Sequence, residues 1–283
     1  MTKHQAVPRR LFQKLQLRTP ALLLLAAICW PMTASVAGQA GTADNCTATA
    51  LPFGDSQRDA LPGTLEILSW NIQKASNSGW SEDLTALGDG IDLAFIQEAS
   101  LQARIPDVIG GVLHQAFAAG YTTGELETGV MTLSSSSPSL DCTFTSREPW
   151  LGTPKATSVT EFPLAGREEK LLAINLHAVN FALGLEDFQQ QFRALDEVLA
   201  AHHGPVILAG DLNTWSSQRQ EMVDEFTGKY GLDAISFSPD LRSTVFGRAL
   251  DHIYVRGMRT LDARVVAVST SDHNPLLVSL SLD

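Results

Sequence analysis

The chain has 283 residues and a formal net charge of −11, because 20 Lys and Arg residues face 31 Asp and Glu residues. Its 44% apolar and 18% charged residues are typical of a globular protein and exclude a disordered or collagen-like chain. The acidity argues against a protein that grips nucleic acid through bulk positive charge. Residues 1–37 hold five basic residues and no acidic one, so the rest of the chain is more acidic still, near −16.

Residues 1–37 have the layout of an export signal. The basic pair Arg9-Arg10 precedes an apolar run at residues 21–28, and small residues follow, with cleavage expected after Ala37 or Ala40. The run is shorter than the ~20 residues that span a bilayer, so we expect export to the periplasm or the medium rather than a membrane anchor. Both a twin-arginine signal and an ordinary Sec signal fit this pattern.

Two cysteines remain after the expected cleavage, Cys46 and Cys142. An even number of cysteines in an exported chain favours one disulfide, with two separate buried thiols as the alternative. No Cys or His spacing indicates a structural zinc site.

Strand-like and helix-like segments alternate along the rest of the chain. The expected strands are Leu65–Ile72, Asp92–Ile96, Val130–Leu133, Lys170–Leu176, Val206–Ala209, Leu250–Val255 and Leu276–Leu282. Apolar spacing predicts a helix at Leu185–His203, and a second helix is expected at Ser216–Tyr230, with Ser216 or Ser217 as its N-cap. This order predicts one α/β domain at residues 61–283, preceded by a linker segment at residues 38–60.

Polar residues stand where six of these strands end or begin. They are Asn71, Glu98, His177 with Asn180, Asp211 with Asn213, Asp251 with His252, and Asp272 with His273. Carboxylate, amide and imidazole groups bind hard cations and move protons. Ligand sites of α/β sheets lie at strand ends, so we expect these residues to converge on one site.

The ordered set resembles the motif series of the endonuclease/exonuclease/phosphatase superfamily. The matching segments are Ser69-Trp70-Asn71-Ile72, Gln97-Glu98, Asn175-Leu176-His177, Gly210-Asp211-Leu212-Asn213, Leu250-Asp251-His252 and Ser271-Asp272-His273. Further segments, among them His177-Ala178-Val179-Asn180-Phe181 and Asp272-His273-Asn274-Pro275, are similar to the YafD-like branch. The resemblance implies a four-layer α/β sandwich, with two β-sheets packed face to face and helices outside, and metal-dependent hydrolysis of phosphoesters.

The resemblance implies a metal site. Glu98 is expected to bind Mg²⁺ directly, with Mn²⁺ as an alternative, and Asn71 would bind beside it directly or through water. Asp272 is a candidate ligand for a second metal or a support for the first. The cation would offset the negative charge of the phosphate.

The resemblance also implies a proton-handling group. His273 would act as general base or stabilise the pentavalent phosphorus centre, and Asp251 would hold its remote ring nitrogen. Asp211 would position or deprotonate the attacking water.

Three further residues would bind the phosphate. Asn213 would donate to a phosphate oxygen, and His177 with Asn180 would hydrogen-bond a non-bridging oxygen.

The sequence departs from the family pattern in two places. His252 follows Asp251 where many relatives have an aromatic residue, and packing beside the site is its simplest role. Ser135 stands where superfamily members often have Arg, and Lys155 or Arg147 could supply that positive charge.

Three substrate classes stay open: nucleic acid, a phospholipid such as sphingomyelin, and a small phosphorylated molecule. No run of Lys and Arg exceeds two residues. No stretch stands out as the apolar hairpin that a membrane-binding phospholipase would expose. A nuclease is favoured by its frequency in the family. We expect a monomer without a protein partner.

A non-catalytic binding module on the same fold is the alternative from another class. Such a module is expected to have lost Glu98, Asp211, Asn213 or His273. All four are present.

Overall fold

The computed structural model describes residues 46–48 and 60–283, apart from 112–113, 149–151 and 181–183. The chain divides into two units, residues 1–37 and 38–283, and every described residue belongs to the second. The expected export signal and nearly all of the expected linker therefore lie outside the described residues. Among the helices that are described, none has the length and apolar character needed to cross a membrane.

The described part of the chain forms two large sheets. The first has the strand order β1 (Cys46–Ala48), β6 (Leu140–Arg147), β7 (Pro154–Pro163), β8 (Lys170–His177), β9 (Val206–Asp211), β13 (Asp251–Arg256) and β10 (Asp233–Ala234). The second has the order β14 (Met258–Val265), β15 (Leu276–Leu282), β2 (Thr64–Asn71), β3 (Leu93–Ser100), β5 (Leu126–Ser134) and β4 (His114–Thr123). Among the strands that the structure describes, β8/β9 and β2/β3 are the parallel pairs.

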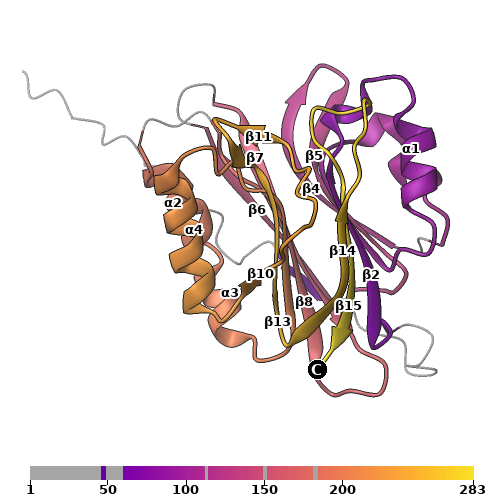
Figure 1. Cartoon of the computed structure of the whole chain (residues 1–283), viewed down its shortest axis with the longest axis vertical. Helices are drawn as coiled ribbons and strands as arrows, with labels where there is room; N and C mark the ends of the chain where they lie inside the picture. The colour runs from indigo at the N-terminus through magenta and orange to yellow at the C-terminus, as the bar shows by residue number, and fades with distance from the viewer. Residues whose placement is uncertain (1–45, 49–59, 112–113, 149–151, 181–183) are drawn as a thin grey trace, which may run out of the picture. The chain divides into compact units, whose positions relative to one another are not determined.

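Helices cover the outer faces of the two sheets. Figure 1 shows α2 (Glu186–Arg193), α3 (Asp196–Ala201) and α4 (Ser217–Lys229) on one side and α1 (Trp80–Leu87) on the other. Short 3-10 turns are present at Gln73–Ala75, Leu101–Ala103 and Ile105–Asp107. This is the predicted four-layer α/β sandwich, with two sheets face to face and helices outside.

Strand periodicity explains the layers, because alternate residues of a strand point to opposite faces. On β9, Ile207 and Ala209 pack in the core between the sheets. Val206 and Leu208 pack on the other face against the helices. The next residue on the inner face is Asp211, where the strand ends. The core therefore gives way to polar side chains at one end of the sandwich.

The long helix expected at Leu185–His203 is two helices. The backbone N–H of Leu195 donates to the carbonyl of Phe192, three residues back, at 2.9 Å. This tighter bond interrupts the four-residue ladder and separates α2 from α3. By contrast, α4 begins as predicted, since Ser216 is its N-cap and its hydroxyl accepts from the backbone N–H of Arg219 at 3.3 Å.

A two-stranded hairpin lies apart from the two sheets. It consists of β11 (Thr244–Val245) and β12 (Arg248–Ala249) and exposes Val245 by 39% and Phe246 by 86%. No stretch of the sequence stands out as such a hairpin, yet the structure exposes these two apolar side chains on one. The apolar pair is too short, and too closely flanked by polar residues, to stand out as a run.

The pairing of β1 with β6 sets Cys46 directly opposite Cys142. A disulfide between these two cysteines stays a prediction.

Candidate active site

The carboxyl ends of the two parallel strand pairs meet at the polar end of the sandwich. Asn71 ends β2 in one sheet, and Asp211 ends β9 in the other. Nδ2 of Asn71 donates to Oδ2 of Asp211 at 3.1 Å, which joins the two sheets directly. His177 ends β8 and lies opposite Asp211 in the parallel register. The structure thus brings together the strand ends that were expected to converge.

Two side chains of the site stand on unusual backbone. The pairing of β3 with β5 shifts register between Ile96 and Ala99, and within this bulge Glu98 has φ of 48°. Asn213 has φ of 49°. A left-handed backbone costs a residue such as Glu about 1–2 kcal/mol, whereas Asn adopts it more readily, and a bulge re-aims a side chain. The fold keeps this strain at Glu98, where the chain turns toward the site.

Gly210 permits the close approach of β9 to β8. A Cβ atom at this position would lie 2.0 Å from the carbonyl oxygen of Leu176, and the φ of Gly210 is 145°. Only glycine fits, so the Gly-Asp pair holds Asp211 beside His177.

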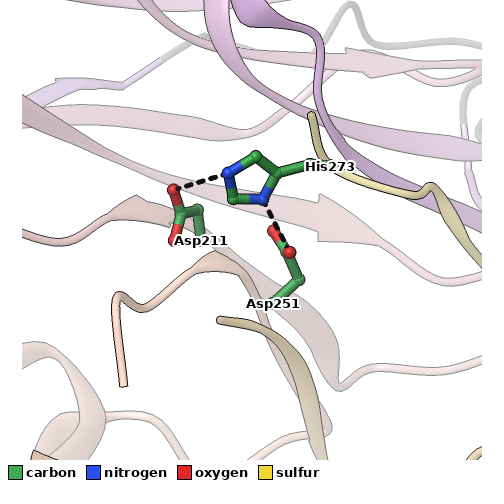
Figure 2. A group of neighbouring side chains, drawn as sticks. All are labelled: Asp211, Asp251 and His273. Carbon is green, nitrogen blue, oxygen red and sulfur yellow. Dashed lines mark hydrogen bonds and ion pairs between the residues drawn. The ribbon is translucent and has the colours of Figure 1, made fainter. Parts of the chain in front are cut away.

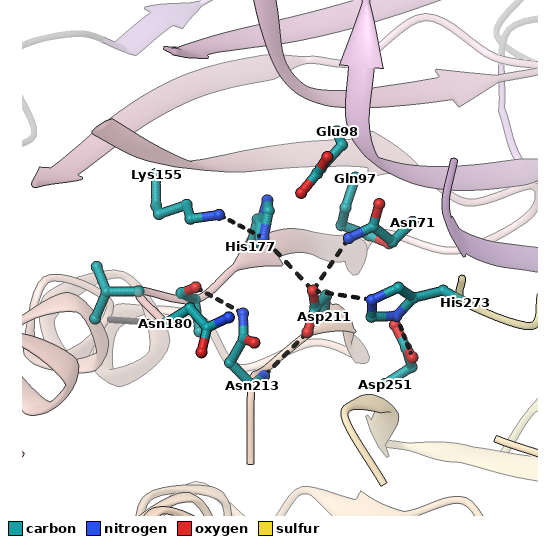
Figure 3. A network of polar contacts seen from close by, with 12 residues as sticks. Asn71, Gln97, Glu98, Lys155, His177, Asn180, Asp211, Asn213, Asp251 and His273 are labelled. Carbon is teal, nitrogen blue, oxygen red and sulfur yellow. Dashed lines mark hydrogen bonds and ion pairs between the residues drawn. The ribbon is translucent and has the colours of Figure 1, made fainter. Parts of the chain in front are cut away.

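Asp211 is the hub of the polar network in Figure 3. Its Oδ2 lies 3.4 Å from Nε2 of His177 and 3.8 Å from Nε2 of His273, while its Oδ1 accepts from the backbone N–H of Asn213 at 3.1 Å. Burial raises the pKa of Asp211, although the charge of His273 opposes that shift. Asp211 is therefore a buried carboxylate with a stronger affinity for protons than an ordinary aspartate.

His273 lies between two carboxylates, as Figure 2 shows. Its Nδ1 is 2.7 Å from Oδ2 of Asp251, and its Nε2 faces Asp211. Burial disfavours the charged ring, but the carboxylates of Asp251 and Asp211 outweigh burial and raise the pKa of His273. The two carboxylates therefore favour the charged form of the ring.

The loop that carries His273 is tied to β2. The hydroxyl of Ser271 donates to the carbonyl of Asn71 at 2.7 Å, and the indole N–H of Trp70 donates to the carbonyl of His273 at 2.9 Å. These bonds fix the His273 loop against the strand that presents Asn71.

A pocket of about 260 Å³ opens beside His177 and Glu98, and two lysines line it. Nζ of Lys155 lies 2.9 Å from Nε2 of His177, and Nζ of Lys74 lies 2.5 Å from Oε2 of Glu98. An ammonium group can only donate, so Nε2 of His177 is the acceptor and the ring is neutral. Burial, followed by the charge of Lys155, lowers the pKa of His177 well below its ordinary value.

A buried carboxylate supports this pocket. Glu148 is 2% exposed, and its Oε1 lies 3.9 Å from Nζ of Lys155 and accepts from the backbone N–H of Asn180 at 3.0 Å. Its Oε2 accepts from the hydroxyl of Thr153. Glu148 therefore links the lysine of the pocket to the loop of Asn180.

Arg219 holds the loops of Asn180 and Asn213 together. Its guanidinium donates to the carbonyls of Asn180 at 2.8 Å and Asn213 at 3.1 Å. It lies 4.5 Å from the ring centroid of Phe188 and 4.6 Å from that of Trp215. The side chains of the two asparagines are also engaged, since Asn180 accepts from Trp215 at 2.9 Å and Asn213 donates to the carbonyl of Ala178 at 3.0 Å.

Three predicted residues lie apart from this network. Asp272 is exposed, and its contacts run to Ser271 and Ser243 rather than to Glu98. His252 points to the other face of β13 from Asp251, where it bonds Thr214 at 2.7 Å and stacks on Tyr254. Arg147 is exposed, so of the two candidate replacement cations it is Lys155 that enters the pocket.

The donor set fits a hard divalent cation. The Glu98 carboxylate points toward Asn71 and His177 in Figure 3, and it already neighbours one cation, the ammonium of Lys74. Carboxylate and amide oxygens are the ligands that Mg²⁺ prefers. A second group could also hold a metal, because ligand atoms of Asp211, Asp251 and His273 all lie within 4.8 Å of one another.

Sequence reasoning missed several residues of the site. Lys74 lies in a short 3-10 turn after β2, and Glu148 and Arg219 are buried charges outside the strand-end motifs. Arg219 lies three residues after the N-cap of a predicted helix, and this position at the helix start is the signal that places it near the strand end of Asp211 and Asn213. No pattern in the sequence distinguishes Lys74 from a surface lysine.

Residues 68–273 match the model of the Endonuclease/Exonuclease/phosphatase family. The chain belongs to this family. A UPF0294 protein of Vibrio vulnificus (strain YJ016) is 40% identical over 223 residues, which cover 78% of each chain. A UPF0294 protein of Yersinia pestis is 38% identical over 233 residues, covering 81% of this chain and 87% of the relative. These relatives confirm the resemblance to the YafD-like branch.

Solved structures of the endonuclease/exonuclease/phosphatase family share the fold. One from Beutenbergia cavernae superposes with a TM-score of 0.60 at 15% identity, covering 77% of this chain and 72% of that one. Sphingomyelinase C from Streptomyces griseocarneus gives a TM-score of 0.55 at 19% identity, with 76% and 99% covered. The mannosyl-6-phosphatase Bt3783 of Bacteroides thetaiotaomicron gives 0.55 at 16% identity, with 77% and 100% covered. The family fold is that of phosphoester hydrolases, and it does not select the substrate.

Proposed function

We propose that this protein is an exported phosphodiesterase that uses Mg²⁺, or Mn²⁺ in its place, to hydrolyse phosphodiester bonds by attack of water, with nucleic acid as the favoured substrate. The observation that supports it most strongly is the buried Asp251–His273–Asp211 network beside Asn71, His177 and Glu98. A binding module has no need for a paired imidazolium and a proton-attracting carboxylate held together in a buried site.

The roles of two residues follow from their electrostatics. His273 is protonated, so it cannot take a proton from water, and its charge instead stabilises the negative charge that develops on phosphorus oxygens. Asp211 has a raised pKa, so it positions the water and accepts its proton. Of the two roles expected for His273, the geometry favours charge stabilisation.

The remaining residues bind and orient the phosphate. Lys155 and Lys74 present ammonium groups at the pocket beside His177, and a phosphate oxygen there would replace the ring nitrogen as the acceptor for Lys155. Glu98 and Asn71 would hold the divalent cation, which when bound neutralises phosphate charge. Asp272 would support this site through the charge it adds near His273 rather than by direct ligation.

Export and the disulfide complete the proposal. Residues 1–37 would direct export, and a Cys46–Cys142 bond would join β1 to β6. The cross-strand register of the two cysteines supports this bond. Export would place the protein in an oxidising compartment, where disulfides form.

The test is turnover of three substrates by the purified protein. Plasmid DNA, sphingomyelin vesicles and bis-p-nitrophenyl phosphate are incubated with Mg²⁺, Mn²⁺ or EDTA, using wild type, His273→Ala and His203→Ala. His203 is an exposed histidine outside the site and serves as the matched control. We expect DNA cleavage that EDTA abolishes, that His273→Ala lowers by at least about 100-fold and that His203→Ala retains.

Two outcomes would contradict the proposal. Absence of turnover on all three substrates would overturn the enzymatic function. Turnover of sphingomyelin alone would show that the protein is a phospholipid phosphodiesterase rather than a nuclease.

A further inference from the structure

Phe246 is the most exposed large apolar side chain in the described part of the protein. It is 86% exposed, whereas Leu261, the next, is 52% exposed. Phe246 stands at the tip of the hairpin formed by β11 and β12, with only Gly247 between it and the second strand. Isolated exposed apolar residues are ordinary, so exposure alone does not give Phe246 a role.

The backbone at Phe246 makes its presence unusual. Phe246 has φ of 51° and Gly247 has φ of 75°. A two-residue hairpin turn with both residues at positive φ favours Asn followed by Gly. Phenylalanine fits this position poorly, and a ring that is 86% exposed gains little packing energy to offset the strain. The requirements of folding therefore do not explain the residue.

The hairpin is fastened to the catalytic loop. The hydroxyl of Ser243 donates to the carbonyl of Asp272 at 2.8 Å, and Nδ2 of Asn274 donates to the carbonyl of Leu241 at 2.7 Å. From the same segment, Arg242 donates to the carbonyl of Asp251 at 3.2 Å. The segment that carries Phe246 is thus hydrogen-bonded to Asp272 and Asn274, the residues on either side of His273. It is also bonded to Asp251, the carboxylate partner of His273.

The ring of Phe246 is also oriented by Trp215. The two ring centroids lie 6.4 Å apart with the planes at 71°, an edge-to-face type of contact, and the Phe246 side chain stays 86% exposed beside the indole. Trp215 donates to Asn180 and follows Asn213 by two residues. Two residues of chain span at most about 7 Å, so the aromatic pair begins directly beside the predicted phosphate ligands.

The charge of the hairpin differs from that of the chain. Residues 241–249 contain Arg242 and Arg248 and no acidic residue, although the whole chain carries −11. Arg242 is paired with Asp240 at 2.7 Å, so the exposed Arg248 is the cation that the hairpin offers to a ligand. A planar ring beside a cationic side chain is a combination by which proteins bind unpaired nucleic-acid strands, since every base has a face that can stack.

We propose that Phe246, oriented by Trp215, stacks on an unpaired nucleobase next to the scissile phosphodiester, which makes single-stranded nucleic acid the substrate. The inference rests on the proposed phosphodiesterase function. A ring held in one orientation suits a planar base, whereas insertion into lipid requires no fixed orientation.

The experiment compares two strands of equal length and charge. One is a single-stranded oligonucleotide, and the other is the same sugar-phosphate backbone made of base-free tetrahydrofuran units. The measured quantity is the ratio of kcat/KM for the two strands. We expect wild type to favour the strand with bases, Phe246→Ala to lower that ratio about tenfold, and Phe246→Tyr to keep it. The matched control is Leu261→Ala, which removes an exposed apolar side chain from β14.

The outcomes separate the inference from the function on which it rests. A ratio unchanged by Phe246→Ala, with both strands cleaved, overturns the stacking role and leaves the phosphodiesterase intact. Failure of wild type to cleave either strand overturns the proposed function and the inference with it. A third outcome is flotation of wild type, but not of Phe246→Ala, with vesicles of sphingomyelin and phosphatidylcholine. It would show that the hairpin binds a membrane and would overturn the proposal that Phe246 stacks on a nucleobase.

Discussion

Nδ1 of His273 lies 2.7 Å from Oδ2 of Asp251, and both side chains are largely buried. The two residues come from different elements, since Asp251 begins β13 and His273 lies in the loop before β15. The bond fixes which ring nitrogen faces Asp211. Against the effect of burial, the charge of Asp251 is the largest of the effects that raise the pKa of His273, ahead of the charge of Asp211.

Replacing Asp251 by Asn should therefore lower kcat about 100-fold and leave KM nearly unchanged, because the amide keeps the shape but not the charge. The pKa of His273 should fall toward its ordinary value, which NMR titration of the ring would measure. Asp233→Asn, at an exposed aspartate of β10, is the control. A normal kcat in Asp251→Asn would show that the His273 charge plays no part in the reaction.

Metal binding should stabilise the folded protein through Glu98. A ligand at 100 times its Kd stabilises a protein by about 2.7 kcal/mol, so the Tm should rise with Mg²⁺ and return with EDTA. Glu98→Gln should remove most of that rise. Glu125→Gln, at an exposed loop glutamate, should retain it. An equal rise in Tm for Glu98→Gln would place the cation elsewhere, with the Asp211, Asp251 and His273 group as the next candidate.

The sequence predicts the part of the site that follows strand periodicity. Asn71, His177 and Asp211 continue the inward-facing positions of buried strands, and the motif order identifies the family before any geometry is known. Glu98 also belongs to a motif, but its direction depends on a bulge that no periodicity signals.

Other parts of the fold have no clear sequence signal. The strands β6 and β7 were not predicted because Thr and Ser occupy many of their positions, so neither forms an apolar run. Lys155 lies on β7, and its entry into the pocket depends on Glu148 and His177, which are distant in sequence. Hairpin strands of two residues, such as β11 and β12, are too short for any pattern to show.

Acid should weaken the fold through His252. Burial, with the charge of Arg242 adding to it, lowers the pKa of His252 to about 4. The unfolded ring has a pKa near ~6.5, so between these values the unfolded state binds a proton that the native state does not. Above about pH 6.5 His252 is neutral in both states and does not lower the free energy of unfolding. As the pH drops toward 4, proton binding by the unfolded state lowers that free energy by up to about 3 kcal/mol.

Urea unfolding at a series of pH values would measure this effect against His252→Phe. The variant should show a shallower loss between pH 6.5 and 4, while His203→Ala, at an exposed histidine, should follow wild type. Identical slopes for His252→Phe and wild type would mean that other groups carry the acid sensitivity.

Substitutions at Phe246 should change stability and substrate preference in opposite directions. Asn tolerates the left-handed backbone of this turn better than Phe, so Phe246→Asn should raise the free energy of unfolding by about 1 kcal/mol. The same change removes the exposed ring and should lower the preference for strands with bases. Gly247→Ala is the matched backbone control, because a Cβ there meets no atom within 4 Å and only the φ of 75° opposes it. It should destabilise the protein by about 1 kcal/mol while keeping the ring. If Phe246→Asn instead destabilises the protein, the ring stabilises the fold by packing on Trp215. The requirements of folding would then explain Phe246.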